Sequence, residues 1–219
     1  KILIFTFNYD LVLEKYFNQN GVINLNNGFS QQRWTNNFDD PAVESKINYY
    51  KIHGSLDWEA NEVGEILCSE NHEYSTNPLL IFGQEYKMLS IEPFLSLLSH
   101  FKEKLYSAKI YIVVGYSFFD TYINNLILQS VNQDPIKKLV LVNPSIKDAD
   151  EFVSKLKAIQ ISDYYQQLYN LKTIDSSKVK VESKCASSFF NEFFDENGDN
   201  IKNYIGALLE EQDKPFANS

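Results

Sequence analysis

The sequence has few of the residues that build zinc modules, disulfide frameworks or membrane spans. Cysteine occurs only twice among 219 residues, as Cys68 and Cys185. Two cysteines are too few for a four-thiolate zinc site or a disulfide framework. No run approaches the roughly 20 apolar residues of a transmembrane helix, and the chain does not begin with a secretory leader. We therefore expect a cytoplasmic protein with two free thiols, no bound metal and no membrane contact.

Positive charge is also scarce. Lys and Arg number 20 against 29 Asp and Glu, and the formal net charge is -9. Binding to a phosphate backbone requires clustered cationic side chains, so we do not expect nucleic acid as a direct ligand. Hydrophobic residues nevertheless make up 44% of the chain and aromatic residues 15%, which is typical of a folded globular domain.

Three short apolar runs predict buried parallel strands. They cover residues 2–7, 110–114 and 139–142, and they are nearly continuous in aliphatic residues, as are strands covered on both faces. A segment of helical periodicity follows each run, behind Asp10, Asp120 and Asp148, respectively. This alternation predicts an α/β fold with a doubly wound, mainly parallel Rossmann-like sheet and helices on both faces. We expect the three runs to be neighbours in one sheet.

The remaining segments suggest a simple division of the chain. Residues 20–50 and 58–88 are less regular, and we expect loops, short strands and a small insertion there. We assign residues 1–160 to the α/β domain and residues 161–219 to a helical C-terminal extension packed on it. The extension contains helical patches, a possible strand at residues 178–182 and a polar turn at residues 196–199.

Polar residues and glycines follow the ends of the predicted strands. Ligands of doubly wound sheets bind outside the carboxyl ends of the strands, so we expect these residues to converge on one cleft. They are Asn8 and Asp10 after the first run, His53 and Gly54 after an apparent strand at residues 49–52, Gly115-Tyr116-Ser117 after the second run, and Asn143 after the third.

In this order, the motifs resemble the nucleotide site of sirtuin-like domains, and specifically the bacterial type that degrades NAD in anti-phage defence. The most family-specific stretch is Gly115-Tyr116-Ser117-Phe118, followed by Asp120 and then by Ile123-Asn124. The resemblance covers about residues 1–146. It implies that the domain of residues 1–160 is a sirtuin-like nucleotide-binding domain without the zinc module of the deacylases.

The resemblance implies a catalytic pair in the first half of the chain. Asn8 would lie beside the nicotinamide ribose and position the attacking water, and Asp10 would bind the nicotinamide carboxamide. His53 would assist deprotonation of the water or hold the ribose 3′-hydroxyl, and imidazole has a suitable pKa near 6.5. Gly54 would let a sugar approach closely.

The resemblance also implies an adenosine and phosphate site in the second half. Gly115, Tyr116, Ser117 and Asp120 belong to the turn that would receive the adenosine ribose and phosphates, and Asn143 would bind the same ribose. Plain structural alternatives stay open for all of these groups. Asn8 and Asn143 are also typical of turns, and Asp10 and Asp120 are also typical helix N-caps.

Two departures from the sirtuin pattern shape the functional prediction. The four cysteines that hold the zinc module of sirtuin deacylases are missing, which disfavours deacylation of a bound peptide. The eight glycines never form a G-x-G pair, although sirtuin-like domains begin with a Gly-rich loop that cradles the pyrophosphate. Either that loop precedes residue 1, which we expect, or the chain is a degenerate homologue that does not bind the nucleotide.

We therefore predict an NAD glycohydrolase that cleaves NAD, its substrate, to nicotinamide and ADP-ribose in abortive-infection defence against phage. The alternative is a non-catalytic binding module that senses NAD or an ADP-ribose derivative. Since uncontrolled NAD cleavage would harm the cell, the resemblance implies a regulated homo-oligomer or a larger defence complex as the working form.

Overall fold

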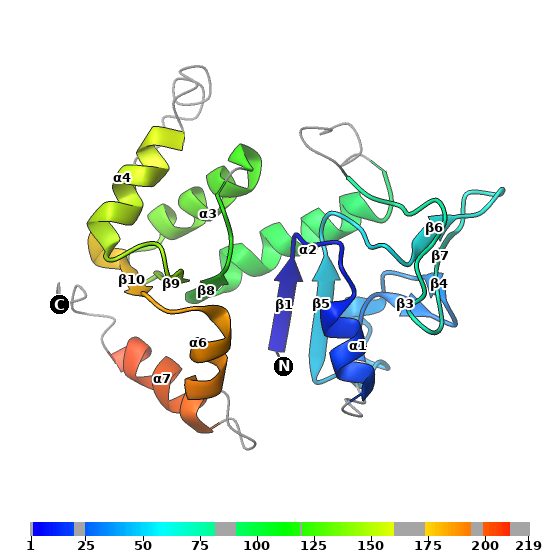
Figure 1. Cartoon of the computed structure of the whole chain (residues 1–219), viewed down its shortest axis with the longest axis horizontal. Helices are drawn as coiled ribbons and strands as arrows, with labels where there is room; N and C mark the ends of the chain where they lie inside the picture. The colour runs from blue at the N-terminus through cyan, green and yellow to red at the C-terminus, as the bar shows by residue number, and fades with distance from the viewer. Residues whose placement is uncertain are drawn as a thin grey trace. The chain divides into compact units, whose positions relative to one another are not determined.

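A computed structural model of the chain describes residues 2–19, 25–81, 91–118, 120–159, 174–193 and 199–210. The chain divides into two compact units, Lys1–Glu103 and Lys104–Ser219 (Figure 1). Helix α2, Phe94–Ser107, contributes residues to both units. None of the helices in the described ranges is long and apolar enough to cross a membrane.

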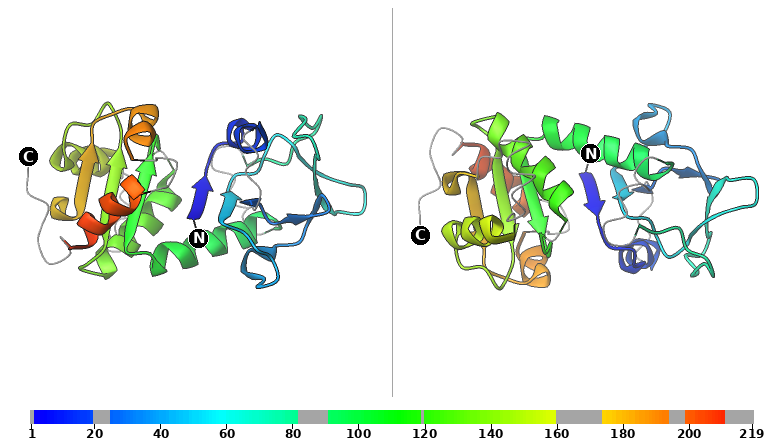
Figure 2. Two further views of the ribbon diagram at one scale, coloured as in Figure 1. Left: turned by 90° about the horizontal axis from the view of Figure 1, so that it is seen from below. Right: turned by 90° about the horizontal axis from the view of Figure 1, so that it is seen from above.

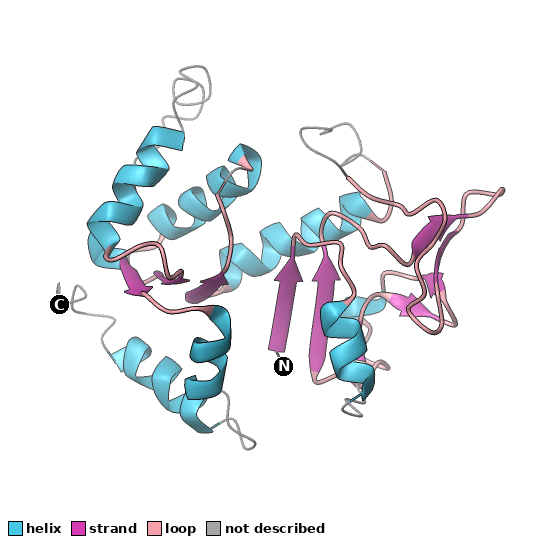
Figure 3. Ribbon diagram, in the orientation of Figure 1, coloured by secondary structure: helices cyan, strands magenta, loops and turns pink. Residues whose placement is uncertain are grey.

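The first unit is built on a three-stranded parallel sheet with the order β1-β5-β2 (Figure 3). Strand β1, Ile2–Thr6, pairs along its whole length with β5, Ile47–Lys51, and the short β2, Leu25–Asn26, pairs with the other edge of β5. Helix α1, Val12–Gln19, follows β1 after a short turn. Because β1 and β5 run in parallel, the segments that follow them leave the same edge of the sheet.

A small antiparallel sheet completes the first unit. Its order is β3-β4-β7-β6. Its strands are β3 (Phe29–Ser30), β4 (Arg33–Trp34), β7 (Ile66–Cys68) and β6 (Trp58–Ala60), and the 3-10 helix η1 spans Asn37–Asp39. The prediction of loops and short strands in this part of the chain is confirmed, except for residues 20–24 and 82–90, which lie outside the described residues.

The second unit contains another three-stranded parallel sheet, with the order β10-β9-β8. Its strands are β8 (Ile110–Val114), β9 (Lys138–Val142) and β10 (Val179–Glu182). The helices are α3 (Thr121–Gln133), α4 (Ala149–Ile159), α6 (Ala186–Phe193) and α7 (Asp199–Glu210), with the 3-10 helix η3 at Ser176–Lys178.

Helices cover both faces of this second sheet (Figure 2). On one face, Val140 and Val142 pack with Phe189 of α6 and Leu208 of α7. On the other face, the Tyr111 hydroxyl lies 2.7 Å from the Ser130 hydroxyl of α3. The predicted α/β architecture, with parallel sheets flanked by helices, is thus confirmed.

Two details of the predicted fold are corrected by the structure. Strand β1 pairs with β5, whereas β8 and β9 belong to another sheet, so the prediction that all three apolar runs are neighbours in one sheet is wrong. Nor is β1 fully buried, because Ile2 and Leu3 are 53% and 39% exposed. An aliphatic run favours a strand, but its pairing partner depends on contacts with distant residues that the run does not encode.

The C-terminal third contributes to the sheet as well as to its helical cover. The predicted strand at residues 178–182 is confirmed as β10, which pairs in parallel with β9. The helical patches predicted in the extension are confirmed as α6 and α7, whereas residues 160–173 and most of the turn expected at residues 196–199 lie outside the described residues.

Candidate functional site

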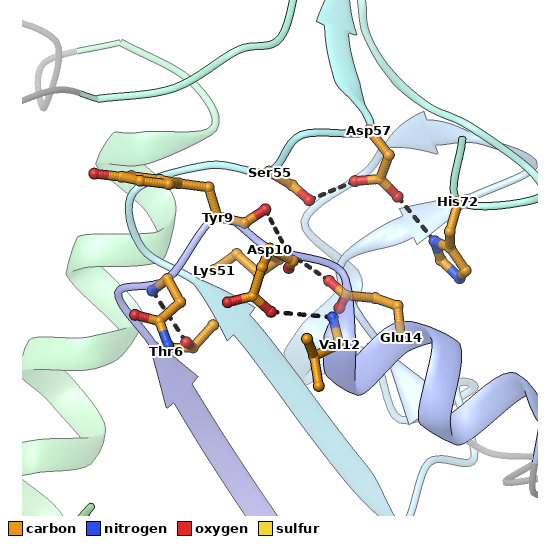
Figure 4. Close-up of polar contacts among 10 residues, drawn as sticks. Thr6, Tyr9, Asp10, Val12, Glu14, Lys51, Ser55, Asp57 and His72 are labelled. Carbon is orange, nitrogen blue, oxygen red and sulfur yellow. Dashed lines mark hydrogen bonds and ion pairs between the residues drawn. The ribbon is translucent and has the colours of Figure 1, made fainter. Parts of the chain in front are cut away.

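The turn between β1 and α1 carries Asn8 and Asp10. The Asn8 backbone N–H donates to Thr6 Oγ1 at 3.1 Å, and the Val12 N–H donates to Asp10 Oδ1 at 3.0 Å (Figure 4). The turn is therefore held by the side chains of Thr6 and Asp10, and the exposed Asn8 side chain makes none of these contacts. The bond to Asp10 forms a local turn before α1 and is not an N-cap, because the Leu11 carbonyl accepts the first bond of the helix. The role of Asp10 toward a carboxamide stays a prediction.

A buried ion pair lies directly beneath this turn. Lys51, the last residue of β5, is 2% exposed, and its Nζ lies 2.6 Å from Glu14 Oε1 on α1 (Figure 4). The same ammonium donates to the backbone carbonyls of Tyr9, at 3.2 Å, and of Asp10. Burial raises the pKa of the Glu14 carboxyl above its usual value, although the Lys51 charge opposes this shift.

His53 and Gly54 follow β5 at the same edge of the sheet. The half-buried His53 ring packs edge to face against Phe7, with ring centroids 5.3 Å apart. Asn8 follows Phe7 in the chain, so His53 lies beside the Asn8 turn. Whether their polar atoms meet on one substrate atom stays a prediction.

Gly54 has a structural requirement of its own. Its φ is +87°, and a Cβ at this position would lie 2.1 Å from the Leu79 carbonyl oxygen. Both the left-handed backbone and the close approach exclude other residues. Its expected role in admitting a sugar stays a prediction.

A second polar network ties the segment after Gly54 to the Asn8 turn. The buried Asp57 accepts a hydrogen bond from the Ser55 hydroxyl through Oδ1, and its Oδ2 lies 2.8 Å from His72 Nδ1. The Leu56 N–H donates to the Tyr9 carbonyl at 3.1 Å. The segment after β5 therefore holds the segment after β1 through the backbone.

In the second unit, the Gly115–Asn124 motif forms a compact turn that begins helix α3. Asp120 caps the helix by accepting from the N–H groups of Tyr122, at 3.0 Å, and Ile123, at 3.1 Å. The Tyr116 hydroxyl donates to Asn124 Oδ1 at 3.1 Å. The capping alternative for Asp120 is confirmed, and Phe119 within the motif lies outside the described residues.

Gly115 also adopts a conformation that favours glycine. Its φ is +64°, and a Cβ there would meet open space. The backbone at the end of β8 is therefore accessible, as an approaching ligand would require.

Three of the predicted nucleotide-binding residues line one pocket of about 170 Å³. The pocket is lined by Tyr116, Ser117, Phe118, Asn143, Ser145, Ile146, Phe152, Lys155 and Leu156. The rings of Phe118 and Phe152 are in T-shaped contact, with centroids 4.9 Å apart. Asn143 Oδ1 accepts from the Ser145 N–H at 2.9 Å, so its turn-forming role is confirmed.

The structure thus places the predicted site residues in two groups. Asn8, Asp10, His53 and Gly54 belong to the first unit, and Gly115, Tyr116, Ser117, Asp120 and Asn143 belong to the second. Each group lies after the carboxyl ends of the parallel strands of its unit. The single cleft shared by both groups stays a prediction.

The sequence prediction did not identify Lys51, Glu14, Ser55, Asp57 or Lys155 as site residues. The sequence feature that could have indicated this network is Lys51, a charged residue at the end of a strand and two residues before His53.

Within the described residues, Asp39, His100 and Glu103 bring potential metal ligands within 4.8 Å of one another. Both carboxylates are exposed, as acidic groups on protein surfaces commonly are. The two cysteines are free and lie in different units.

Residues 2–170 match the family model of the SIR2-like domain. The chain belongs to the SIR2-like domain family. The predicted resemblance to sirtuin-like domains is therefore confirmed, and the site residues described above all lie within the SIR2-like match. The family supports an NAD-related function. No match to the chain was found among curated proteins.

Proposed function

We propose that this SIR2-like protein is an NAD glycohydrolase that converts NAD and water to nicotinamide and ADP-ribose. The observation that supports it best is the exposed Asn8 side chain, in a turn that Thr6 and Asp10 hold in place. An amide group can both donate and accept hydrogen bonds. It suits the orientation of a water molecule beside a ribose.

The proposed reaction breaks the bond between the nicotinamide nitrogen and ribose C1′. The bonding electron pair leaves with nicotinamide, and C1′ develops oxocarbenium character. Asn8 orients a water molecule toward C1′, and His53 accepts the proton that this water loses as the new C–O bond forms. In this proposal Asp10 binds the carboxamide of the leaving nicotinamide and Gly54 admits the sugar.

The pocket of the second unit is proposed to bind the adenosine half of NAD. The rings of Phe118 and Phe152 and the side chains of Ile146 and Leu156 supply apolar contacts. Ser117 and Asn143 supply polar groups for ribose hydroxyls. Gly115, Tyr116 and Asp120 support this site through the turn that they form.

A sensing module for NAD or ADP-ribose is the second candidate. It is favoured by the pocket of the second unit, whose polar groups suit binding. The described residues that line this pocket include no histidine or carboxylate to catalyse a reaction. A sensor would bind NAD without releasing nicotinamide. In either case, we propose a cytoplasmic role in abortive infection, as a homo-oligomer or in a larger defence complex, with no direct contact to nucleic acid.

The test is nicotinamide release from NAD by the purified full-length protein and its variants. Asn8→Ala is expected to abolish release without loss of the folded state, because Asn8 is an exposed turn residue. His53→Ala is expected to lower turnover by about 10²–10⁴-fold, the usual effect of losing an acid–base group. Asn77→Ala, at another exposed asparagine, is the matched control and should retain full activity.

The outcomes separate the two candidates. NAD binding without nicotinamide release by the unmodified protein would support the sensor. Unchanged release by Asn8→Ala or His53→Ala would remove that residue from the proposed mechanism.

A further inference from the structure

Lys51 is the most unusual side chain near the proposed site. It ends the central strand of the first sheet, is 2% exposed, and carries a charge that water would normally solvate. A lysine at the carboxyl end of a parallel strand could in principle bind a substrate phosphate. The contacts of Lys51 exclude that role.

An ammonium group has three N–H donors, and all three donors of Lys51 have acceptors in one short segment. The acceptors are the Tyr9 carbonyl at 3.2 Å, the Asp10 carbonyl, and Glu14 Oε1 at 2.6 Å. No donor remains for a ligand. Lys51 therefore acts on the turn between β1 and α1 and not on the substrate.

The same contacts constrain Asn8 from both sides. On its N-terminal side, the Asn8 N–H is fixed by Thr6 Oγ1. On its C-terminal side, the Tyr9 carbonyl accepts from both Lys51 Nζ and the Leu56 N–H. Because each peptide unit is planar, fixing the Tyr9 and Asp10 carbonyls fixes two consecutive peptide planes. The Asn8 side chain is thereby presented from a turn with little freedom.

Stability alone does not explain a buried ion pair at this position. Moving two charges out of water is costly, and apolar residues of similar volume often stabilise a fold equally well or better. An apolar pair, however, could not bond the two carbonyls. We propose that Lys51 is a positioning residue for Asn8, and that Glu14 holds the Lys51 ammonium under the turn. The consequence for catalysis rests on the proposed function.

The decisive variant is the double substitution Glu14→Leu with Lys51→Met. It removes both buried charges together, so neither is left unpaired, and it removes the hydrogen bonds to the two carbonyls. Lys51→Met alone would leave Glu14 buried without its partner, which is strongly destabilising. Glu14→Gln is the comparison variant, because it removes the counter-charge of Lys51 but keeps an oxygen for the ammonium and leaves Lys51 bonded to the Tyr9 and Asp10 carbonyls.

Two measurements are made on each folded variant of the whole chain. Backbone amide hydrogen exchange over residues 8–12 and at Leu56 reports the order of the turn without any substrate. Steady-state nicotinamide release reports its effect on catalysis. For the double variant, we expect exchange of the turn about tenfold faster or more, as local opening becomes easier. We also expect kcat at least about tenfold lower at nearly unchanged KM, as for loss of an interaction made in the transition state.

For Glu14→Gln, we expect a lower free energy of unfolding, because Lys51 loses its counter-charge. Its amide exchange and kcat should nevertheless lie closer to those of the unmodified protein than to those of the double variant, because the bonds to the two carbonyls are kept. Wild-type exchange and kcat in the double variant would overturn the proposal. So would a double variant that fails to fold, since Lys51 would then be required by the whole unit rather than by the turn. If the turn in Glu14→Gln were as mobile as in the double variant, the effect would come from the charge pair and not from the bonds to the carbonyls. That result would also overturn the proposal.

The two proposals can fail separately. If the unmodified full-length protein releases no nicotinamide, the proposed function fails, but amide exchange still decides whether Lys51 orders the turn. If nicotinamide is released and the turn is equally ordered in all variants, only the positioning role fails.

Discussion

The central strands of the two parallel sheets occupy the same topological position but differ in chemistry. Strand β9 has the sequence Lys-Leu-Val-Leu-Val, and all five of its residues are buried. Strand β5 has the sequence Ile-Asn-Tyr-Tyr-Lys, and the four residues after Ile47 are buried as well. After the buried Lys138 at its start, β9 is entirely aliphatic, whereas β5 buries an amide, two phenol rings and an ammonium.

This difference shows two ways of using a central strand. The aliphatic side chains of β9 stabilise the second unit through apolar packing, for example with Phe189 and Leu208. Such packing requires complementary shapes but, unlike a hydrogen bond, no particular orientation of the atoms in contact. The polar groups of β5 need partners at defined distances, since an unpaired buried polar group is costly. Asn48 and Lys51 therefore determine where the neighbouring backbone lies. In the first unit this backbone includes the Asn8 turn.

The cysteines give the largest expected difference between the units. Burial raises the pKa of Cys68 to about 12, whereas hydrogen bonds from Ser187 and Ser188 lower the pKa of the exposed Cys185 to about 7. Since the thiolate is the nucleophile, we expect iodoacetamide at pH 8 to modify Cys185 about 10³-fold faster or more. Peptide mass spectrometry over a time course measures both rates.

Cys185→Ser is the control for this experiment. It should leave only the slow reaction, and denaturation should then make Cys68 reactive. Similar rates for the two thiols in the folded protein would show that the half-buried position of Cys68 does not protect its thiol.

The aliphatic centre of the second unit should be the more sensitive to lost volume. Leu141 in β9 is fully buried, and Leu141→Ala is expected to lower the free energy of unfolding by about 2–5 kcal/mol through lost burial and an unfilled cavity. Denaturant unfolding measures this change. Leu209→Ala is the matched control, because Leu209 is 37% exposed and its truncation should cost about 0.5 kcal/mol or less. Equal effects of both truncations would contradict the assigned core.

The difference between the polar β5 and the aliphatic β9 explains which strands could be predicted from the sequence. The aliphatic runs of β8 and β9 show their strands directly, and the ordered motifs from Asn8 to Asn143 led to the correct family. Strand β5 was expected only in part, at residues 49–52, because its polar residues break the apolar pattern of a buried strand. Its pairing with β1 was not predicted at all.

The candidate site was predictable at the level of residue types but not of partners. Asn8 and His53 stand out because they follow strands. The Lys51 contact with Tyr9 joins residues 42 positions apart, and no local pattern encodes it. The helix cap of Asp120 and the local turn of Asp10 were recognisable from the sequence because their partners are within three residues. Short-range hydrogen bonds can thus be predicted from sequence, whereas the network beneath the turn requires the fold.

The smallest of the expected effects concerns the polar centre of the first unit. Asn48 is 2% exposed. Its Nδ2 donates to the Phe38 carbonyl at 3.2 Å and to the Tyr50 hydroxyl at 3.1 Å, and its Oδ1 accepts from the Ser45 hydroxyl at 2.8 Å. Asn48→Ala would leave these partners without their bonds, and we expect a loss of about 1–3 kcal/mol in the free energy of unfolding.

Asn48→Asp tests whether the hydrogen-bond donors of Asn48 matter more than the volume of its side chain. It keeps the shape and the acceptor for Ser45 but replaces both N–H donors with an oxygen, so the Phe38 carbonyl would face an acceptor. At neutral pH, Asn48→Asp should therefore destabilise the protein at least as much as Asn48→Ala, and protonation of the new carboxyl at low pH should relieve part of the loss. Denaturant unfolding at two pH values measures both effects. If Asn48→Asp were harmless at neutral pH, the hydrogen bonds of β5 would not determine the position of the neighbouring backbone, and the contrast with β9 would reduce to a difference in side-chain volume.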